Sequence, residues 1–181
     1  MDELAAEVLE IEDKEVLIDE MMHKYGQEIL QLVYSYVKNK EVAEDLTQDI
    51  FVKCYRSLDS FKGKSTLRTW LWRIAINQSK DYLKSWYNKN VSLTENESEF
   101  TGYQNGSVEK TVIQNDEDQM LASVVMNLPI KYREVIYLYY FEELAIKEIA
   151  VVIEMKENTV KTRLKRAKEL LKERLEEISN G

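Results

Sequence analysis

The chain has 181 residues, of which 44% are hydrophobic, and a formal net charge of -8 at pH 7. One cysteine and one histidine exclude a disulfide framework and a Cys/His metal cluster. No apolar run approaches the roughly 18 residues of a membrane span, and the acidic N-terminus lacks a signal-peptide pattern. We therefore expect a cytoplasmic protein with no cofactor, no metal and no direct membrane insertion.

Helices are the expected secondary structure. Five glycines and one proline are few for a sheet-rich fold, Lys, Glu and Leu are plentiful, and clean β alternation is missing. The sequence therefore predicts an all-α chain of one or two small domains.

Charge is distributed unevenly along the chain. Residues 1–20 carry nine acids and one base, whereas residues 60–90 carry seven bases and one acid. Residues 156–174 carry eight bases and three acids. Two basic blocks separated by acidic segments predict two contacts with one polyanion. The acidic lead, residues 1–15, is typical of a solvated tail, with a nucleic-acid mimic or a self-inhibitory segment as the alternative.

The first helix is predicted over residues 16–37. His23 within it is interpreted as an ordinary surface or core-edge residue. Apolar residues recur at spacings of three and four, which predicts one buried face, made of Ile18, Met22, Tyr25, Ile29, Leu32, Val33 and Tyr36.

A second helix is predicted over residues 41–57. Its apolar residues follow a strict step of four, which predicts a buried stripe of Val42, Leu46, Ile50, Cys54 and Leu58. On another face the acids and amide of Asp45, Gln48 and Asp49 gather into a patch. The residues alone leave open whether that patch is solvated or binds a partner.

A short basic loop, residues 61–66, leads into a third helix, residues 67–87. The loop carries Phe61, Lys62 and Lys64. In the helix, a polar and basic stripe is predicted beside Trp70, and Leu67, Leu71 and Ile74 form a buried stripe. Cations that hold phosphate beside aromatic rings are typical of a nucleic-acid surface, whereas Trp72 and Trp86 are interpreted as core. The basic stripe consists of Arg73, Asn77, Lys80 and Lys84.

Residues 88–114 are rich in Asn, Ser, Thr, Gly and Glu and lose the apolar period, which predicts a flexible polar linker. Beyond it, a helix opens at Asp116, and Pro129 separates it from another at residues 130–141. The apolar residues assigned to the interior of these two helices are Met120, Leu121, Val124, Val125, Leu128, Val135, Ile136, Leu138 and Tyr139.

The last predicted pair is a helix-turn-helix. A short helix over residues 146–153 buries Ile146, Ile149, Ala150 and Ile153, and Thr159 is expected to cap a second helix. That second helix buries Val160, Leu164, Ala167 and Leu171 and turns Thr162, Lys165, Arg166 and Glu169 outward, with Lys161 and Lys168 on one shoulder and Arg163 on the other. A basic outer face is typical of a recognition helix, and a solvated helix closing a bundle is the alternative.

These blocks, in this order, resemble the extracytoplasmic-function group of the sigma-70 family of bacterial RNA polymerase sigma factors. The resemblance rests on AEDLTQDIFVKCYRSLDSF, TWLWRIAINQSKDYL, LPIKYREVIYLYYFEELAIKEIA and NTVKTRLKRAKELL. It implies sigma region 2 at residues 16–90, a linker at 91–114 and sigma region 4 at 115–181, the latter a four-helix module. Ala145 and Asn158 depart from the Ser and Gly that are usual in the family.

The resemblance also implies roles for the candidate residues. Asp45, Gln48 and Asp49 would dock on the coiled coil of the largest polymerase subunit, and region 4 would meet the polymerase flap. Phe61, Lys62 and Lys64 with the stripe Arg73, Asn77, Lys80 and Lys84 would hold the promoter -10 element. Lys161, Thr162, Lys165 and Arg166 would read the -35 element, and Arg163 would contact phosphate or form an internal pair. A membrane-anchored anti-sigma protein is an implied partner.

Two other classes of protein compete with this interpretation. A dimeric regulator that binds duplex DNA alone explains residues 115–178 but neither Ala43–Phe61 nor Thr69–Leu83. An adaptor that binds polymerase without reading promoters leaves the basic helix unexplained. An enzyme is not expected, because no phosphate-binding glycine loop and no catalytic His, Cys or carboxylate constellation is found.

Overall fold

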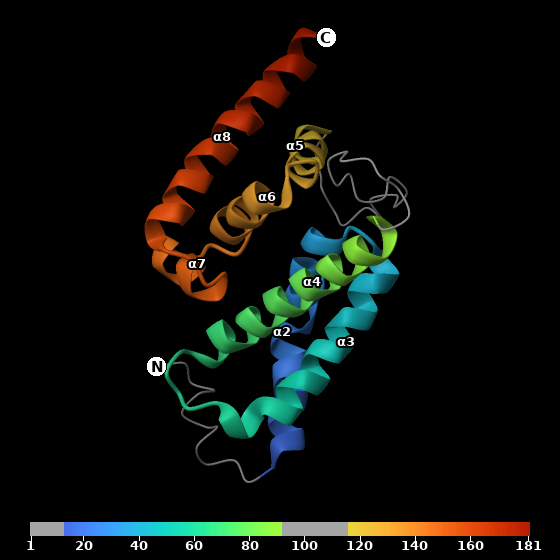
Figure 1. The fold of residues 1–181 in the computed structure, drawn as a ribbon, viewed down its shortest axis with the longest axis vertical. Helices are drawn as coiled ribbons and strands as arrows, with labels where there is room; N and C mark the ends of the chain where they lie inside the picture. Colours follow the sequence, from blue (N-terminus) through green and yellow to red (C-terminus); the bar gives the residue numbers. More distant parts are fainter. Residues whose placement is uncertain (1–12, 92–115) are drawn as a thin grey trace. The chain divides into compact units, whose positions relative to one another are not determined.

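The computed structural model describes residues 13–91 and 116–181 (Figure 1). Within these residues every regular element is helical, so the all-α expectation is confirmed. The chain divides into two compact units, Met1–Glu95 and Asn96–Gly181. Interpretations of residues 1–12 and 92–115 lie outside the described residues. None of the described helices combines the length and the apolar character needed to cross a membrane.

The first unit packs α2 (Lys14–Val37), α3 (Lys40–Ser57) and α4 (Leu67–Val91) against one another, with the 3-10 turn η1 (Leu58–Ser60) after α3. Asp13 caps α2 by accepting the Glu15 N–H at 3.0 Å. Lys38 ends that helix in the left-handed region, with φ 54°. Asn39 then caps α3 by accepting the Val42 N–H at 3.0 Å. Two consecutive capping residues therefore make the reversal between α2 and α3.

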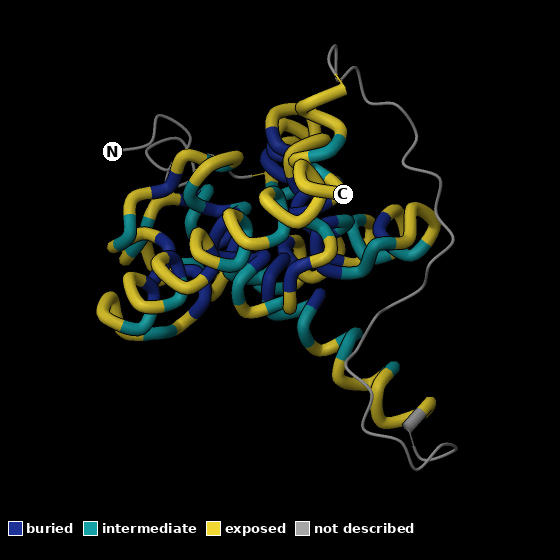
Figure 2. The backbone as a smooth tube through the Cα atoms, turned by 90° about the horizontal axis from the view of Figure 1, so that it is seen from above, coloured by how far each residue is buried: buried dark blue, intermediate teal, exposed yellow. Residues whose placement is uncertain are grey.

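Buried residues recur along the inner face of each helix (Figure 2). The Tyr25 ring meets the Trp72 ring edge to face, with centroids 5.4 Å apart, at the contact between α2 and α4. Trp72 is 1% exposed, so its assignment to the core is confirmed, whereas Trp86 is only half-buried.

Met22 was wrongly assigned to the α2 core. It is 46% exposed, and Met21 is fully buried in its place. Both positions flank the apolar stripe at about 40–60°, so the sequence pattern admits either one. The side of α2 that α3 and α4 cover decides between them.

The stripe predicted for α3 is only partly correct. Ile50, Cys54 and Leu58 are buried, but Val42 and Leu46 are half-buried, while Ala43 and Phe51 fill the core. A step of four residues turns the helix by about 400°, so each step drifts about 40° from the starting direction. Val42 and Leu46 therefore point up to about 120° away from the core, and the stripe reaches the core only from Ile50 onward. Ile74 of α4 is likewise half-buried, whereas Leu67 and Leu71 are fully buried.

The second unit contains α5 (Asp116–Met126), α6 (Ile130–Ile136), the π-helical turn η2 (Tyr137–Phe141), α7 (Ile146–Val152) and α8 (Glu157–Asn180). Two arginines hold the turn between α5 and α6. Arg133 donates to the carbonyl oxygens of Met126 and Leu128 at 2.8 and 3.3 Å, and Arg174 donates to that of Asn127 at 2.7 Å. Carbonyl groups at the end of α5 that lack a partner within the helix thus accept hydrogen bonds from charged donors.

Several interior assignments in this unit are correct and others are wrong. Val124, Val125, Leu128, Val135, Ile136 and Leu138 are buried. Leu121 is 40% exposed, because α5 presents that side to a groove. Met120, Tyr139, Ile146 and Leu171 are half-buried. The predicted helix at 130–141 widens into a π-turn in its last five residues.

A Schellman motif ends α7. The Met155 N–H donates to the Ala150 carbonyl at 2.9 Å, the Glu154 N–H donates to the Val151 carbonyl at 3.3 Å, and Glu154 has φ 56°. The chain then reverses, and Lys156 takes the capping position of α8. Thr159 was therefore wrongly predicted as the cap, since its own N–H already donates to the Lys156 carbonyl at 3.0 Å.

Replacing Glu154 by glycine should stabilise the second unit. Glycine adopts positive φ without the steric cost of a β-carbon, so Glu154→Gly should raise the free energy of unfolding by about 1 kcal/mol. Lys161→Gly, at an exposed helical position of α8, should lower it by about the same amount. Urea unfolding followed by circular dichroism measures both. A destabilised Glu154→Gly variant would contradict the assigned turn geometry.

Candidate nucleic-acid interface

The outer face of α8 carries a compact basic surface. Lys161, Thr162, Lys165 and Arg166 are all exposed. On the opposite side Val160, Leu164 and Ala167 are at most 4% exposed. Burial of that stripe fixes the rotation of α8 about its axis, so the four outward side chains are presented together.

Neighbouring groups hold two of these side chains. The Thr162 hydroxyl donates to the Asn158 carbonyl at 2.9 Å. Arg166 lies 3.2 Å from Glu169 and 3.6 Å from Glu173, all on the same helix. Exposed pairs of this kind contribute little to stability, so Arg166 can exchange its carboxylate partners for another anion at small cost.

Arg163 is placed apart from the other four. Its side chain is 22% exposed, and its guanidinium lies 3.6 Å from the carboxylate of Glu134, which is 3% exposed. The structure thus shows the internal pair, one of the two interpretations that the sequence allowed for Arg163. A buried carboxylate needs a nearby cation, and this pair joins α6 to α8.

The stripe on α4 is also brought to one face. Lys84 is exposed and Arg73, Asn77 and Lys80 are half-buried, whereas Leu71 and Ala75 on the opposite side are fully buried. These four positions fall within about 60° around the helix axis. Sequence reasoning therefore grouped this stripe correctly.

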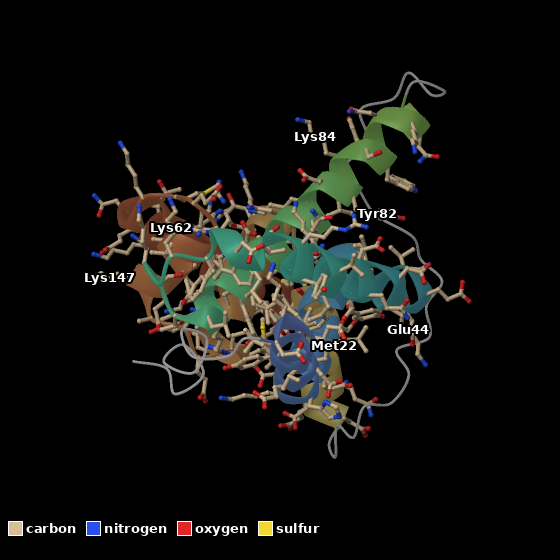
Figure 3. All side chains as sticks on the ribbon, turned by 90° about the horizontal axis from the view of Figure 1, so that it is seen from below. Met22, Glu44, Lys62, Tyr82, Lys84 and Lys147 are labelled. Atoms are coloured by element: carbon tan, nitrogen blue, oxygen red, sulfur yellow. The ribbon has the colours of Figure 1, made fainter. Side chains whose placement is uncertain are left out.

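The loop before α4 places aromatic rings at its base and cations at its tip. The half-buried Phe61 ring lies 5.4 Å from the ring of Trp70, which is 8% exposed. Gly63 adopts φ 68°, and Lys62 and Lys64 on either side of it are exposed. Figure 3 labels Lys62 at this end of the first unit.

The start of α4 next to this loop is capped. The Thr66 hydroxyl accepts the Thr69 N–H at 3.1 Å. The cap fixes the loop against the start of the helix that carries the basic stripe.

Asp45, Gln48 and Asp49 are all exposed and lie on the side of α3 opposite Ile50 and Cys54. Burial raises the pKa of the Cys54 thiol to about 12, so this thiol stays neutral and is no candidate nucleophile.

Sequence reasoning missed an apolar extension of this patch. Val52 is 47% and Tyr55 is 39% exposed, and both continue the same face of α3. The available signal was their position, since both fall outside the arc of α3 that is buried.

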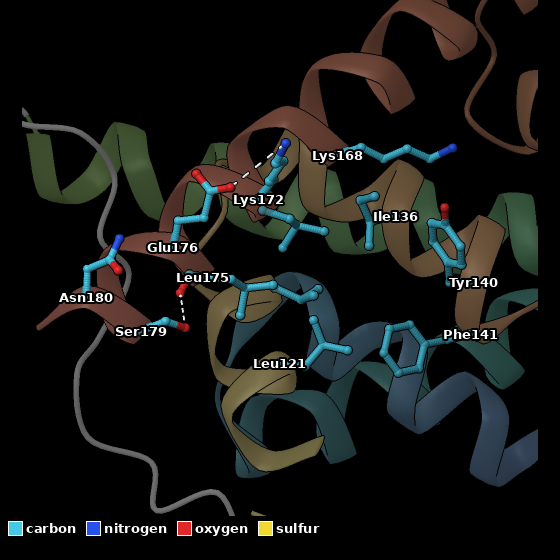
Figure 4. Close-up of a pocket in the computed structure, with 12 residues that line it drawn as sticks. Leu121, Ile136, Tyr140, Phe141, Lys168, Lys172, Leu175, Glu176, Ser179 and Asn180 are labelled. Carbon is cyan, nitrogen blue, oxygen red and sulfur yellow. Dashed lines mark hydrogen bonds and ion pairs between the residues drawn. The ribbon is translucent and has the colours of Figure 1, made fainter. Parts of the chain in front are cut away.

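An apolar groove of about 560 Å³ was also missed (Figure 4). It lies between α5, η2 and the C-terminal part of α8, and Tyr140 and Phe141 on its wall are 52% and 56% exposed. Lys168 borders it, with its ammonium 5.6 and 5.7 Å from the ring centroids of Tyr139 and Tyr140. Exposed apolar surface of this kind is typical of a protein-docking site.

Metal ligands are not clustered in the described parts of the chain. Across residues 13–91 and 116–181, no three His, Cys, Asp or Glu side chains are placed to hold an ion.

Comparison with known families matches both units. The model of sigma-70 region 2 matches residues 21–87, and that of sigma-70 region 4 matches residues 118–171. The Pseudomonas aeruginosa RNA polymerase sigma-H factor is 30% identical over 88% of this chain and 86% of its own length. The chain belongs to the sigma-70 family.

Further relatives place this sigma factor in the extracytoplasmic-function group. The factor SigW of Bacillus subtilis is 32% identical over 85% of this chain and 86% of its own length. The sigma-E factor of Escherichia coli is 32% identical over 86% of this chain and 84% of its own length.

Solved structures share the fold of this sigma factor. CnrH, solved with the cytosolic domain of CnrY, superposes with a TM-score of 0.67, 22% identity and coverage of 96% of this chain and 95% of that one. RpoE of Bartonella quintana, solved with the anti-sigma factor NepR, gives 0.66 and 22%, over 87% of this chain and 96% of that one.

Among the charged residues of α8, we expect substitution of Arg163, which pairs with Glu134, to lower the stability of the protein most. Arg163→Gln leaves the buried Glu134 carboxylate without this cation and should lower the free energy of unfolding by about 2–3 kcal/mol. Lys165→Gln, at an exposed position of the same helix, should change it by less than about 0.5 kcal/mol.

Urea unfolding of the two variants tests this difference. Adding Glu134→Gln to Arg163→Gln should recover part of the loss. Equal stability of the Arg163→Gln and Lys165→Gln variants would show that the pair does not hold α8.

Proposed function

We propose that this sigma factor binds core RNA polymerase and directs it to promoters by recognising a -10 and a -35 element. The observation that carries the proposal is the pair of outward basic stripes, one on α4 and one on α8, in a chain of net charge -8. The two stripes fall within the residues matched by the region 2 and region 4 models. Each stripe thus gathers positive charge on one face of its helix although the chain as a whole is acidic.

The second unit would bind the -35 element. A helix fits the major groove of B-form DNA, and the outward row of α8 offers donors for base edges and phosphates. Lys161, Thr162, Lys165 and Arg166 carry this contact in the proposal. Arg163 contributes indirectly, because its pair with Glu134 holds the rotation of the helix.

The first unit would bind the -10 element and help to open the DNA. Phosphates would lie along Arg73, Asn77, Lys80 and Lys84, while the loop at residues 61–66 would receive an unstacked base. A base leaves its stack at a cost of a few kcal/mol, which a pocket with aromatic walls can offset. The rings of Phe61 and Trp70 stand at the base of that loop. The sigma factor itself would catalyse no reaction, since RNA synthesis belongs to the polymerase.

Protein contacts would use other faces. Asp45, Gln48 and Asp49, extended by Val52 and Tyr55, would bind the coiled coil of the largest polymerase subunit. The groove beside Tyr140 and Phe141 would receive the polymerase flap, because it exposes large apolar side chains.

An anti-sigma protein is the regulator that we infer. Both superposed structures, CnrH and RpoE, were solved with another protein, CnrY and the anti-sigma factor NepR respectively. Our inference extends that kind of control to this chain, with the partner membrane-anchored and this sigma factor acting in the cytoplasm.

The alternative function, a regulator that binds DNA without polymerase, accounts for fewer of the observed surfaces. It would use the α8 surface but neither the α4 stripe nor the α3 patch. A chain of net charge -8 also binds free DNA weakly unless a large partner delivers it.

Charge reversal on α3 tests the polymerase contact. Asp45→Lys with Asp49→Lys should weaken binding to core polymerase by at least about tenfold, because a complementary charge becomes a repulsive one. Asp19→Lys with Glu20→Lys changes the net charge equally at exposed positions of α2 and should have little effect. Titration of labelled protein with core polymerase gives both affinities. Equal weakening of the two variants would exclude the patch as a docking face.

Substitutions on α8 test the -35 contact. Lys165→Ala with Arg166→Ala should lower transcription by about 10- to 100-fold on the preferred -35 sequence and much less on altered ones. Lys131→Ala, at an exposed lysine of α6 outside the α8 surface and outside the groove, is the control. Transcription in vitro from a set of -35 variants gives the pattern. A uniform loss on every sequence would mean phosphate contact only.

A further inference from the structure

Arg166 differs from the lysines beside it on the outward face of α8 in its partners. Its guanidinium lies 3.2 Å from the carboxylate of Glu169 and 3.6 Å from that of Glu173. Lys161 and Lys165 are exposed, and within the described residues no carboxylate pairs with either of them. The proposed contact with the -35 element does not account for this difference between the arginine and the lysines.

The two glutamates lie on the side of α8 that carries Arg166. They follow it by three and seven residues, so the three side chains project within about 60° of one another. All three are exposed. One positive and two negative formal charges give this cluster a net charge of -1. The outward face of α8 is therefore positive at Lys161 and Lys165 but negative around Arg166.

A phosphate and the edge of a base interact differently with such a cluster. The fold loses little stability when Arg166 leaves its carboxylates, but both remain on the helix surface beside it. The Debye length is about 10 Å at 0.1 M salt, so a phosphate bound to Arg166 would stay within range of both negative charges. The major-groove edge of guanine offers uncharged acceptors, O6 and N7, to an arginine. The carboxylates therefore repel phosphate much more strongly than they repel a base edge.

We propose that Glu169 and Glu173 are specificity-determining residues for the -35 contact. They keep phosphate away from Arg166 and leave its guanidinium to bind the uncharged edge of a base. Lys161 and Lys165, which lack such neighbours, take the phosphates. This division lowers the affinity for DNA of arbitrary sequence and makes the contribution of Arg166 depend on the base pair that it meets. The inference rests on the proposed -35 function of α8.

Neutralising the two carboxylates tests the proposal in full-length protein bound to core polymerase. The DNA probes are a promoter that the wild-type holoenzyme transcribes and the same promoter with its -35 element scrambled. Glu169→Gln with Glu173→Gln should tighten binding to the scrambled promoter by about tenfold, because Arg166 then accepts phosphate. Binding to the intact promoter should tighten less, so the preference for the intact -35 element should fall by about threefold to tenfold.

Salt dependence gives a second readout, which a change in stability alone would not produce. One additional phosphate contact should steepen the slope of log affinity against log salt concentration by about 0.9. In an Arg166→Ala background the same two glutamine substitutions should leave both the slope and the preference unchanged, since the side chain that would bind the phosphate is absent. Asp19→Asn with Glu20→Gln removes two negative charges from exposed positions of α2 and should also change neither.

Unchanged preference and slope in the Glu169→Gln, Glu173→Gln variant would overturn the proposal. A gain of equal size without Arg166, or in the α2 control, would also overturn it, because general charge repulsion would then explain the effect. Either result removes only the role of the two glutamates if the wild-type holoenzyme prefers the intact -35 element. A wild-type holoenzyme without that preference would contradict the proposed -35 function and this inference with it.

Discussion

Burial of one side of α4 and of α8 constrains everything that these helices present to solvent. In α8, Val160, Leu164 and Ala167 are almost completely buried, and in α4, Leu67, Leu71 and Ala75 are fully buried. Since a helix turns about 100° per residue, fixing one side fixes the direction of every other side chain. The basic rows are thus oriented by hydrophobic packing, which is far stronger than any attraction between the surface charges themselves.

Sequence reasoning was most accurate where periodicity alone decides the outcome. It predicted the helices of both units, the basic row of α4 and the outward row of α8, because these depend on local spacing. It was less accurate where tertiary contacts choose between neighbours. Met21 and Met22 flank the same stripe, and only the packing of α3 and α4 on α2 selects Met21.

The geometry of turns explains another part of the difference between the sequence-based prediction and the structure. Glutamate at positive φ carries no sequence signal, since glycine is the usual residue there, so the Schellman turn at Glu154 could not be read from the sequence. The prediction instead placed the start of α8 at Thr159, a plausible capping residue. Likewise the pair between Arg163 and Glu134 joins residues far apart in the chain, and spacing within α8 alone could only leave it open.

The distribution of charge over the protein follows from the orientation of these helices. An acidic chain with two basic rows is poorly suited to bind DNA on its own, yet well suited to act once a polymerase delivers it to the promoter. The residues proposed to bind polymerase on α3 and those proposed to bind the promoter on α4 belong to adjoining helices of one packed core. Binding to polymerase would thereby set the place where α4 meets the DNA.

Run-off transcription on a fragmented genomic library, with purified core polymerase in the presence and absence of this protein, tests the central claim most directly. The account predicts discrete new transcripts whose start sites share an upstream pair of motifs. No new start sites, together with duplex binding by the protein alone, would contradict it and favour a free-standing regulator.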